Sequence, residues 1–302
     1  MERREHEVGR KLHFGFGHSA SLRLGPAGTF DAVHPIEHLR YVARAHGVDP
    51  TALVEETAHA LGSLHFDPAG LVVACRRIVE RHPFSGPLWW LCSSVASSSE
   101  PFETVWELAD RIRSDRTGAE LAAALADGAD VVTIGDPSVI SSGLARRGDV
   151  RVLAIDVDHS ATSFVRTLER FDVDYEPVDA GAAGAATRVA DVVLIEALAL
   201  DAERIVVPSG SSTIAASASA WGTPVWLVAG VGRRLPSPFV DAMEVRRTEL
   251  ASDVDDWTID VEILPARFVT DVIGPLGSMP MGPAAAQAEC PMSAELLRRP
   301  AM

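Results

Sequence analysis

Cysteine, basic residues, aromatic residues and long apolar runs are all scarce in this sequence of 302 residues. The three cysteines, Cys75, Cys92 and Cys290, lie far apart and lack metal-binding or redox spacing, so we expect a reducing compartment and no zinc site. The charged N-terminus has no signal-peptide core, and no apolar run is long enough to cross a bilayer. Together these absences predict a soluble, cytoplasmic protein.

Positively charged residues are few relative to negatively charged ones. Lys and Arg number 27 against 42 Asp and Glu, giving a net charge of -15. This excludes nucleic acids and anionic membranes as partners, because both are bound through a basic surface. A small anionic ligand in a locally neutral pocket stays compatible with the charge, and no motif predicts a cofactor or a metal.

Composition and periodicity divide the chain into an N-terminal extension (1–33), a helical domain (34–128), an α/β ligand-binding domain (129–277) and a flexible tail (278–302). The extension has no periodicity, and we expect it to pack on its own domain or on a partner. The tail is rich in Pro, Met and Ala and has no apolar period, which is typical of a mobile segment.

Prolines at helix starts mark the helical domain. Pro35, Pro50 and Pro68 each precede apolar residues at helical spacing, and further helices are predicted around 105–112 and 117–126. The turns between them are short, as in helical bundles.

From residue 129 onward, short β-branched runs alternate with small-residue helices. This pattern predicts a Rossmann-like parallel sheet, with a ligand site outside the carboxyl ends of its strands. The strands are predicted near 131–134, 152–155, 175–178, 192–195, 205–207 and 225–228. After Pro236 we expect a charged segment, then a loop and short helix over 259–273.

A helix that begins at Ser209, Gly210 and Ser211 and ends at Gly222 follows the fifth of these runs. Its N–H groups and hydroxyls suit an anion, although plain N-capping explains the same residues.

Polar residues fall at several predicted strand ends. We consider Asp136, Asp156, His159 and Glu196 as candidate acid–base residues, because carboxylates and histidine can transfer protons. The alternatives stay open: Asp136 before a proline suits an N-cap, Asp156 and Asp179 suit helix caps, and Asp158-His159 suits an exposed loop. If Glu196 is buried it needs a partner, such as Arg188 or a ligand hydroxyl.

Four segments carry a resemblance to a known family. They are RHPFSGPLWWL near Pro83, DGADVVTIGDPS, the stretch from Ile205 to Ala229, and RRLP with DVEILPARFVTDVIGPLG. In order and spacing they resemble the translation initiation factor 2B alpha/beta/delta subunits, a family that also holds methylthioribose-1-phosphate and ribose-1,5-bisphosphate isomerases. The resemblance covers roughly residues 35–277.

The resemblance implies an isomerase site whose chemistry this chain lacks. The family's catalytic cysteine falls on Gly135, its aspartate on Leu198, and its phosphate-binding Asn-Lys pair on Val207-Pro208. The arginine of its Arg-Pro motif falls on His82, whereas Gly210 and Ser211 keep their chemical type. We therefore expect a diverged member that binds a sugar-phosphate- or nucleotide-like molecule. The residues that we expect to contact it are His82, Gly135, Asp179, Ser209, Gly210, Ser211 and Arg233.

Three functions follow from this resemblance. The first is such a ligand-binding protein with altered acid–base chemistry, the second a non-catalytic regulatory or scaffold protein, and the third, disfavoured by Gly135 and Leu198, a sugar-phosphate isomerase. Arg233 could supply the lost positive charge, although a surface turn is the commoner role. The family also implies a homodimer, with apolar surface near Trp221 and Trp226 as the candidate contact.

Overall fold

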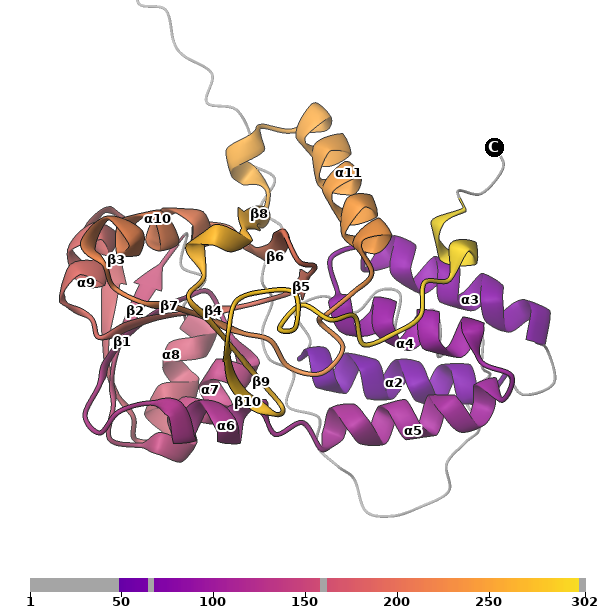
Figure 1. Ribbon diagram of the computed structural model, residues 1–302, viewed down its shortest axis with the longest axis horizontal. Coiled ribbons are helices and arrows are strands. Elements are labelled where there is room, and N and C mark those ends of the chain that lie inside the picture. Colours follow the sequence, from indigo (N-terminus) through magenta and orange to yellow (C-terminus); the bar gives the residue numbers. More distant parts are fainter. Residues whose placement is uncertain (1–48, 65–67, 158–161, 299–302) are drawn as a thin grey trace, which may run out of the picture.

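The computed structural model describes residues 49–64, 68–157 and 162–298. A helical half lies beside an α/β half, as the sequence predicts (Figure 1). The helical half contains α2, α3, α4 and α5, with bounds Pro50–Gly62, Pro68–Arg81, Gly86–Ser97 and Pro101–Arg113. Each begins with a proline in its first turn, where the missing N–H costs no helical hydrogen bond.

The α/β half is built on a seven-stranded sheet of order β10-β9-β7-β4-β1-β2-β3. All neighbouring strands are parallel except β10 and β9, which form an antiparallel hairpin at one edge. The bounds are β1 Asp130–Ile134, β2 Arg151–Asp156, β3 Asp174–Asp179, β4 Val192–Glu196, β7 Val225–Val228, β9 Asp271–Gly274 and β10 Gly277–Pro280.

Helices cover both faces of this sheet, because alternate residues of its strands point to opposite sides. Val131 and Val192 pack with α6 (Thr117–Ala124), α7 (Ser138–Arg147) and α8 (Thr162–Arg170), whereas Val132 and Val193 pack with α9 (Ala183–Val189) and α10 (Ser211–Trp221). Helix α6 thus belongs with the sheet by packing, although the sequence places it in the helical domain.

A second, three-stranded antiparallel sheet, of order β5-β6-β8, lies between the two halves. Its strands are β5 Ala199–Leu200, β6 Arg204–Pro208 and β8 Val261–Pro265. The predicted strand at 205–207 is therefore real but joins this sheet instead of the parallel one. Of the loop and short helix predicted over 259–273, the short helix is present as the 3-10 turn Ala266–Phe268. The segments on either side of it are strands instead of loop: β8 pairs with β6 and β9 pairs with β7.

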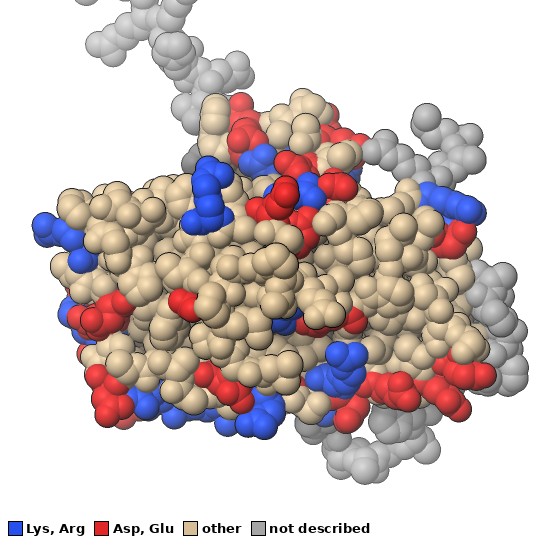
Figure 2. Space-filling view, in the orientation of Figure 1, with Lys and Arg blue, Asp and Glu red and all other residues tan. Residues whose placement is uncertain are grey.

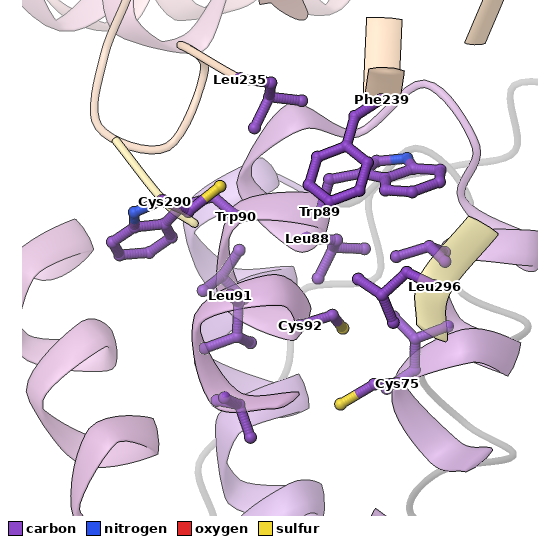
Figure 3. Close-up of a cluster of buried hydrophobic side chains, with 14 of the residues drawn as sticks. Cys75, Leu88, Trp89, Trp90, Leu91, Cys92, Leu235, Phe239, Cys290 and Leu296 are labelled. Carbon is purple, nitrogen blue, oxygen red and sulfur yellow. The ribbon is translucent and has the colours of Figure 1, made fainter. Parts of the chain in front are cut away.

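The charged segment predicted after Pro236 is a 17-residue helix, α11 (Ser237–Asp253). The fully buried residues of α11, Phe239, Val240 and Met243, all lie in its first turns. The rest of the helix is mostly polar, and this is why its sequence shows no apolar stripe. These three residues join the core of the helical half, where the Phe239 and Trp89 rings lie 4.9 Å apart (Figure 3).

Residues 278–298 differ from the predicted flexible tail, because they pack along both halves. Ala285 and Ala286 are buried against the sheet, and Cys290 and Leu296 enter the helical core (Figure 3). Ser93 on α4 holds the segment directly: its Oγ donates to the Pro291 carbonyl at 2.5 Å and accepts from the Ser293 N–H at 3.1 Å. Because these apolar residues enter the cores one at a time, they have no regular spacing from which the sequence could predict their burial.

Candidate functional site

The carboxyl ends of the central strands face the helical half. The Gly86 N–H at the start of α4 donates to the Leu198 carbonyl just beyond β4, at 3.1 Å. The Val231 N–H beyond β7 donates to the Asp115 carboxylate at 2.9 Å. The region between the halves is therefore where the sequence predicts a ligand site.

Glu196 closes β4 and is buried, with 7% of its side chain exposed. Its Oε2 accepts from the Val139 and Ile140 N–H groups, at 2.9 and 3.1 Å, in the first turn of α7. Its Oε1 accepts from the Arg233 guanidinium at 2.6 Å. The carboxylate thus caps α7, the helix that follows the neighbouring strand β1, and it pairs with the buried Arg233. Both of its oxygens are therefore bound by groups of the chain itself.

Arg233 does not lie in a surface turn: only 4% of its side chain is exposed. Its backbone is fixed by the Leu200 N–H, which donates to the Arg233 carbonyl at 2.8 Å. Within the described part of the chain its Nε has no hydrogen-bond partner. Arg188, the partner expected for Glu196, lies instead over the Trp221 ring, 5.7 Å from its centroid.

Burial raises the pKa of Glu196 above its ordinary value, and the Arg233 charge and the two α7 N–H groups oppose this rise. Asp49, at the start of α2, adds a smaller upward contribution. A carboxyl group can serve as a general acid when its pKa is raised, but a substrate must reach it. Here the groups that bind Glu196 occupy the positions that a substrate would need.

Asp136 does not cap α7, because Glu196 does so and Pro137 stands at the N-cap position. Its side chain is exposed near the end of β1. Partial desolvation raises the pKa of Asp136, a hydrogen bond with Ser163 lowers it, and the charge of Asp49 raises it. Asp136 is therefore a carboxylate at the open end of the sheet with no helix-capping role.

Asp156 and Asp179 are paired residues at the ends of β2 and β3. Asp156 is half-buried, whereas the exposed Asp179 accepts from the Gly181 N–H at 2.7 Å and so caps the turn that follows, as one prediction held. The fourth candidate acid–base residue, His159, lies outside the described residues.

Gly135 and Gly210 both adopt positive φ, +78° and +89°. A Cβ on Gly210 would lie 2.6 Å from the Ile134 side chain, so β1 and the turn before α10 approach each other closely. A Cβ on Gly135 would meet only Pro208, at 3.8 Å, and the cost of a side chain there comes from the left-handed backbone.

The N-terminus of α10, predicted as an anion site, is already bound to a carboxylate. The Ser212 N–H donates to Oε1 of Glu262 on β8, at 2.7 Å. Ser211 is buried and donates to the Pro208 carbonyl, and the half-buried Ser209 donates its N–H to the Asp260 carbonyl. His82 is half-buried in the turn between α3 and α4, four residues before Gly86.

Sequence reasoning missed Glu262, which lay in a segment expected to be a loop and short helix. It also missed that Arg233 and Arg234 are both buried in ion pairs, with Glu196 and Glu289 respectively, each at 2.6 Å. The sequence feature that could have indicated these buried ion pairs is the presence of two adjacent arginines among apolar residues. Among the residues that the structure describes, no group of His, Cys, Asp and Glu could hold a metal ion, and no helix could span a membrane.

No protein-family model matches the sequence, and no functionally curated protein is significantly similar to it. Solved structures do match. Translation initiation factor eIF-2B of Pyrococcus horikoshii OT3 gives a TM-score of 0.69 at 16% identity, over 84% of this chain and 98% of that chain. The tetrameric eIF2B-beta2-delta2 complex of Chaetomium thermophilum gives 0.62 at 15% identity, over 82% and 90%.

A third match is 5-methylthioribose 1-phosphate isomerase of Pyrococcus horikoshii OT3, with a TM-score of 0.61 at 13% identity, over 83% of this chain and 86% of that chain. Likeness at such identities concerns architecture. This chain has the fold shared by the eIF2B subunits and 5-methylthioribose 1-phosphate isomerase, the fold predicted from its sequence.

Proposed function

We propose that this chain acts by binding, without isomerase chemistry, in the manner of a regulatory or scaffold subunit. The observation that carries the proposal is the environment of Glu196. Both of its oxygens are held by Arg233 and by the N-terminus of α7, so it serves the fold. A buried, hydrogen-bonded ion pair of this kind leaves no free lone pair aimed at a substrate.

The positions where the resembled isomerases carry their reactive groups support the proposal. Gly135 has no side chain and a left-handed backbone, and Leu198 packs against the core of the helical half. Neither residue can transfer a proton.

The place for a phosphate also supports it. Glu262 already accepts from the N-terminus of α10, and a phosphate brought to the same N–H group would be repelled by that carboxylate. Arg233, the buried arginine of this site, is paired with Glu196. We therefore expect that phosphorylated sugars are not the preferred ligand of this protein.

A second candidate function is binding of an unphosphorylated sugar- or nucleoside-like molecule at the same end of the sheet. It is favoured by Asp136, which is exposed, carries no capping role, and is of a type that accepts hydrogen bonds from hydroxyl groups. Asp156 would lie beside it at the end of the neighbouring strand β2. Ser209 follows β6 of the smaller sheet, whose Pro208 lies 3.8 Å from the Cβ position of Gly135.

Self-association is part of the proposal. Trp221 and Val189 are exposed by 57% and 60% on the neighbouring helices α10 and α9. Trp226, the other residue named in the predicted contact, packs on the opposite face of the sheet with α6, α7 and α8 and does not join this surface. We expect a homodimer through this surface. Light scattering should give twice the chain mass of 32.2 kDa for the wild type, and Trp221→Glu should return it to one.

One experiment separates the functions. The wild-type chain is incubated with ribose 1,5-bisphosphate or methylthioribose 1-phosphate, turnover is followed by phosphorus NMR, and thermal shifts are recorded with these compounds, ribose and adenosine. A ligand at 100 times its dissociation constant would stabilise the fold by about 2.7 kcal/mol. We expect no turnover and no shift with the phosphates, whereas a shift with ribose or adenosine that Asp136→Asn removes supports the second candidate. Turnover that Asp136→Asn or Asp156→Asn abolishes would overturn the non-catalytic proposal.

A further inference from the structure

A projecting arm, residues 237–260, stands apart from both halves of the molecule (Figure 1). It consists of α11 and the short turn that follows, and it buries side chains mainly near its base. Three of its apolar side chains are left open to solvent: Val245, Val254 and Trp257, with exposed fractions of 48%, 50% and 81%. An arm with this much exposed apolar surface has the properties of a binding surface.

The arm is also strongly acidic. Its 24 residues include seven carboxylates and only two arginines, a net charge of -5, and acidic side chains gather over it in Figure 2. One face of α11 is open and is lined by Asp241, Glu244, Val245, Thr248, Glu249 and Ser252. These residues recur at helical spacing, so the open face runs along one side of the helix.

Among the described residues, the three carboxylates of this face pair with two cations, Arg204 and Arg246, and Arg246 binds Glu249 at 3.3 Å. Arg204 from β6 binds Asp241 at 2.6 Å and Glu244 at 2.9 Å, and it also binds Asp201 at 2.6 Å. Three carboxylates thus share one guanidinium, and their hydrogen bonds and charge raise the pKa of Arg204 above its ordinary value although burial opposes this. A further cation beside Asp241 and Glu244 would therefore meet an excess of negative charge.

The chain itself contains a segment of the opposite character. Residues 8–30, VGRKLHFGFGHSASLRLGPAGTF, hold Arg10, Lys11 and Arg23 and have no acidic residue, in a chain of net charge -15. Phe14 and Phe16 follow the basic pair after Leu12 and His13. This basic segment therefore combines a charge opposite to that of the arm with apolar side chains that can pack on the exposed apolar side chains of the arm.

The length of the chain permits the contact. Eighteen residues separate the basic segment from Asp49, where the description of the fold begins. They can span about 60 Å when extended, which exceeds the diameter of about 45 Å expected for a domain of this size. We propose that residues 8–30 dock within the same molecule along the open face of α11, with Arg10 and Lys11 on its carboxylates and the phenylalanines against Val245.

Lys11 gives a direct test, because it is the only lysine of the chain. A zero-length carbodiimide couples a lysine amine only to a carboxylate in contact with it, and mass spectrometry of the dilute, full-length protein locates the bond. We expect Lys11 to couple to Asp241, Glu244 or Glu249 at least tenfold more than to Asp110 or Asp127, whose side chains are 76% and 94% exposed. Lys11→Arg keeps the charge and should remove the coupling.

Hydrogen exchange of the full chain gives the second readout. Charge reversal by Arg10→Glu with Lys11→Glu should raise the exchange rates of α11 amides at least fivefold, and Val245→Glu should do the same. Val73→Glu, at an exposed valine on α3, is the matched control and should leave α11 unchanged. Coupling of Lys11 in proportion to carboxylate exposure, coupling between two molecules, or unchanged exchange in the charge-reversed variant would each overturn the proposal. None of these results depends on catalysis or on a small-molecule ligand.

Discussion

Replacing Glu196 by glutamine tests whether this residue serves the fold. The substitution keeps the shape of the side chain but removes its charge, and it leaves the Arg233 guanidinium, 4% exposed, without a counter-charge. It also turns an amide N–H₂ toward donors, either the α7 N–H groups or Arg233. Breaking one side of a buried pair costs about 3–5 kcal/mol, so we expect Glu196→Gln to lower the free energy of unfolding by that amount.

The corresponding change in melting temperature follows from the size of the fold. With roughly 240 ordered residues and an unfolding entropy of about 2.1 cal/mol/K per residue, 1 kcal/mol corresponds to about 2 °C. The variant should therefore melt about 6–10 °C below the wild type in a scan followed by circular dichroism.

Two matched variants make this measurement interpretable. Glu176→Gln breaks the surface pair of Arg151 and Glu176, whose side chains are 47% and 56% exposed, and should cost less than about 1 kcal/mol. Adding Arg233→Met to Glu196→Gln removes the orphaned charge, so the double variant should be less destabilised than the sum of the single ones. A Glu196→Gln protein as stable as the wild type, yet unable to bind or turn over a ligand, would refute the reasoning and return Glu196 to a catalytic role.

Three further variants probe other parts of the structure. Ser93→Ala removes two hydrogen bonds to the C-terminal segment and should raise the hydrogen-exchange rates of the amides over 291–297 about tenfold; unchanged exchange would contradict the docked segment. Asp136→Asn should become progressively more stable relative to the wild type as the pH rises above 3.8, since a raised folded-state pKa means that ionisation of Asp136 destabilises the fold, and denaturant midpoints between pH 3.5 and 7 that keep a constant gap would refute this. Glu262→Ala should lose about 1 kcal/mol as the α10 N-terminus loses its cap, and should then be stabilised by inorganic phosphate in thermal melts, whereas an identical phosphate response in the wild type would show that Glu262 does not block the site.

The parallel sheet was predictable because its signals are local. Runs such as Val192–Glu196 are apolar at every position, as strands covered on both faces must be, and Gly222 ends α10 with a left-handed φ of +75°. The same holds for the helical half, whose prolines fix where the helices begin. Residues that look alike locally were harder: Ile205–Val207 is as apolar as Val192–Ile195, yet it joins an antiparallel sheet through β8.

The candidate site was predictable only in outline. The sequence placed polar residues at the strand ends and required a partner for a buried Glu196, but it named the wrong arginine. It predicted an anion site at the start of α10, but it did not show that the carboxylate of Glu262 from the same chain occupies this site. Some carboxylates, such as Asp136, remain exposed, whereas others are bound by groups of the chain. The tertiary contacts that decide this cannot be predicted from the spacing of residues in the sequence.

The sequence by itself determined the alternation of strands and helices, the division into a helical and an α/β half, and the absence of the reactive side chains at Gly135 and Leu198. These depend on the nature of a residue and of neighbours within a few positions. Only the tertiary structure decided the pairing of Glu196 with Arg233, 37 residues away, the capping of Ser212 by Glu262, 50 residues away, and the docking of Ser293 on Ser93, 200 residues away. Such partners meet because the whole chain closes around common cores, and buried polar groups must then be satisfied by whatever that closure brings within reach.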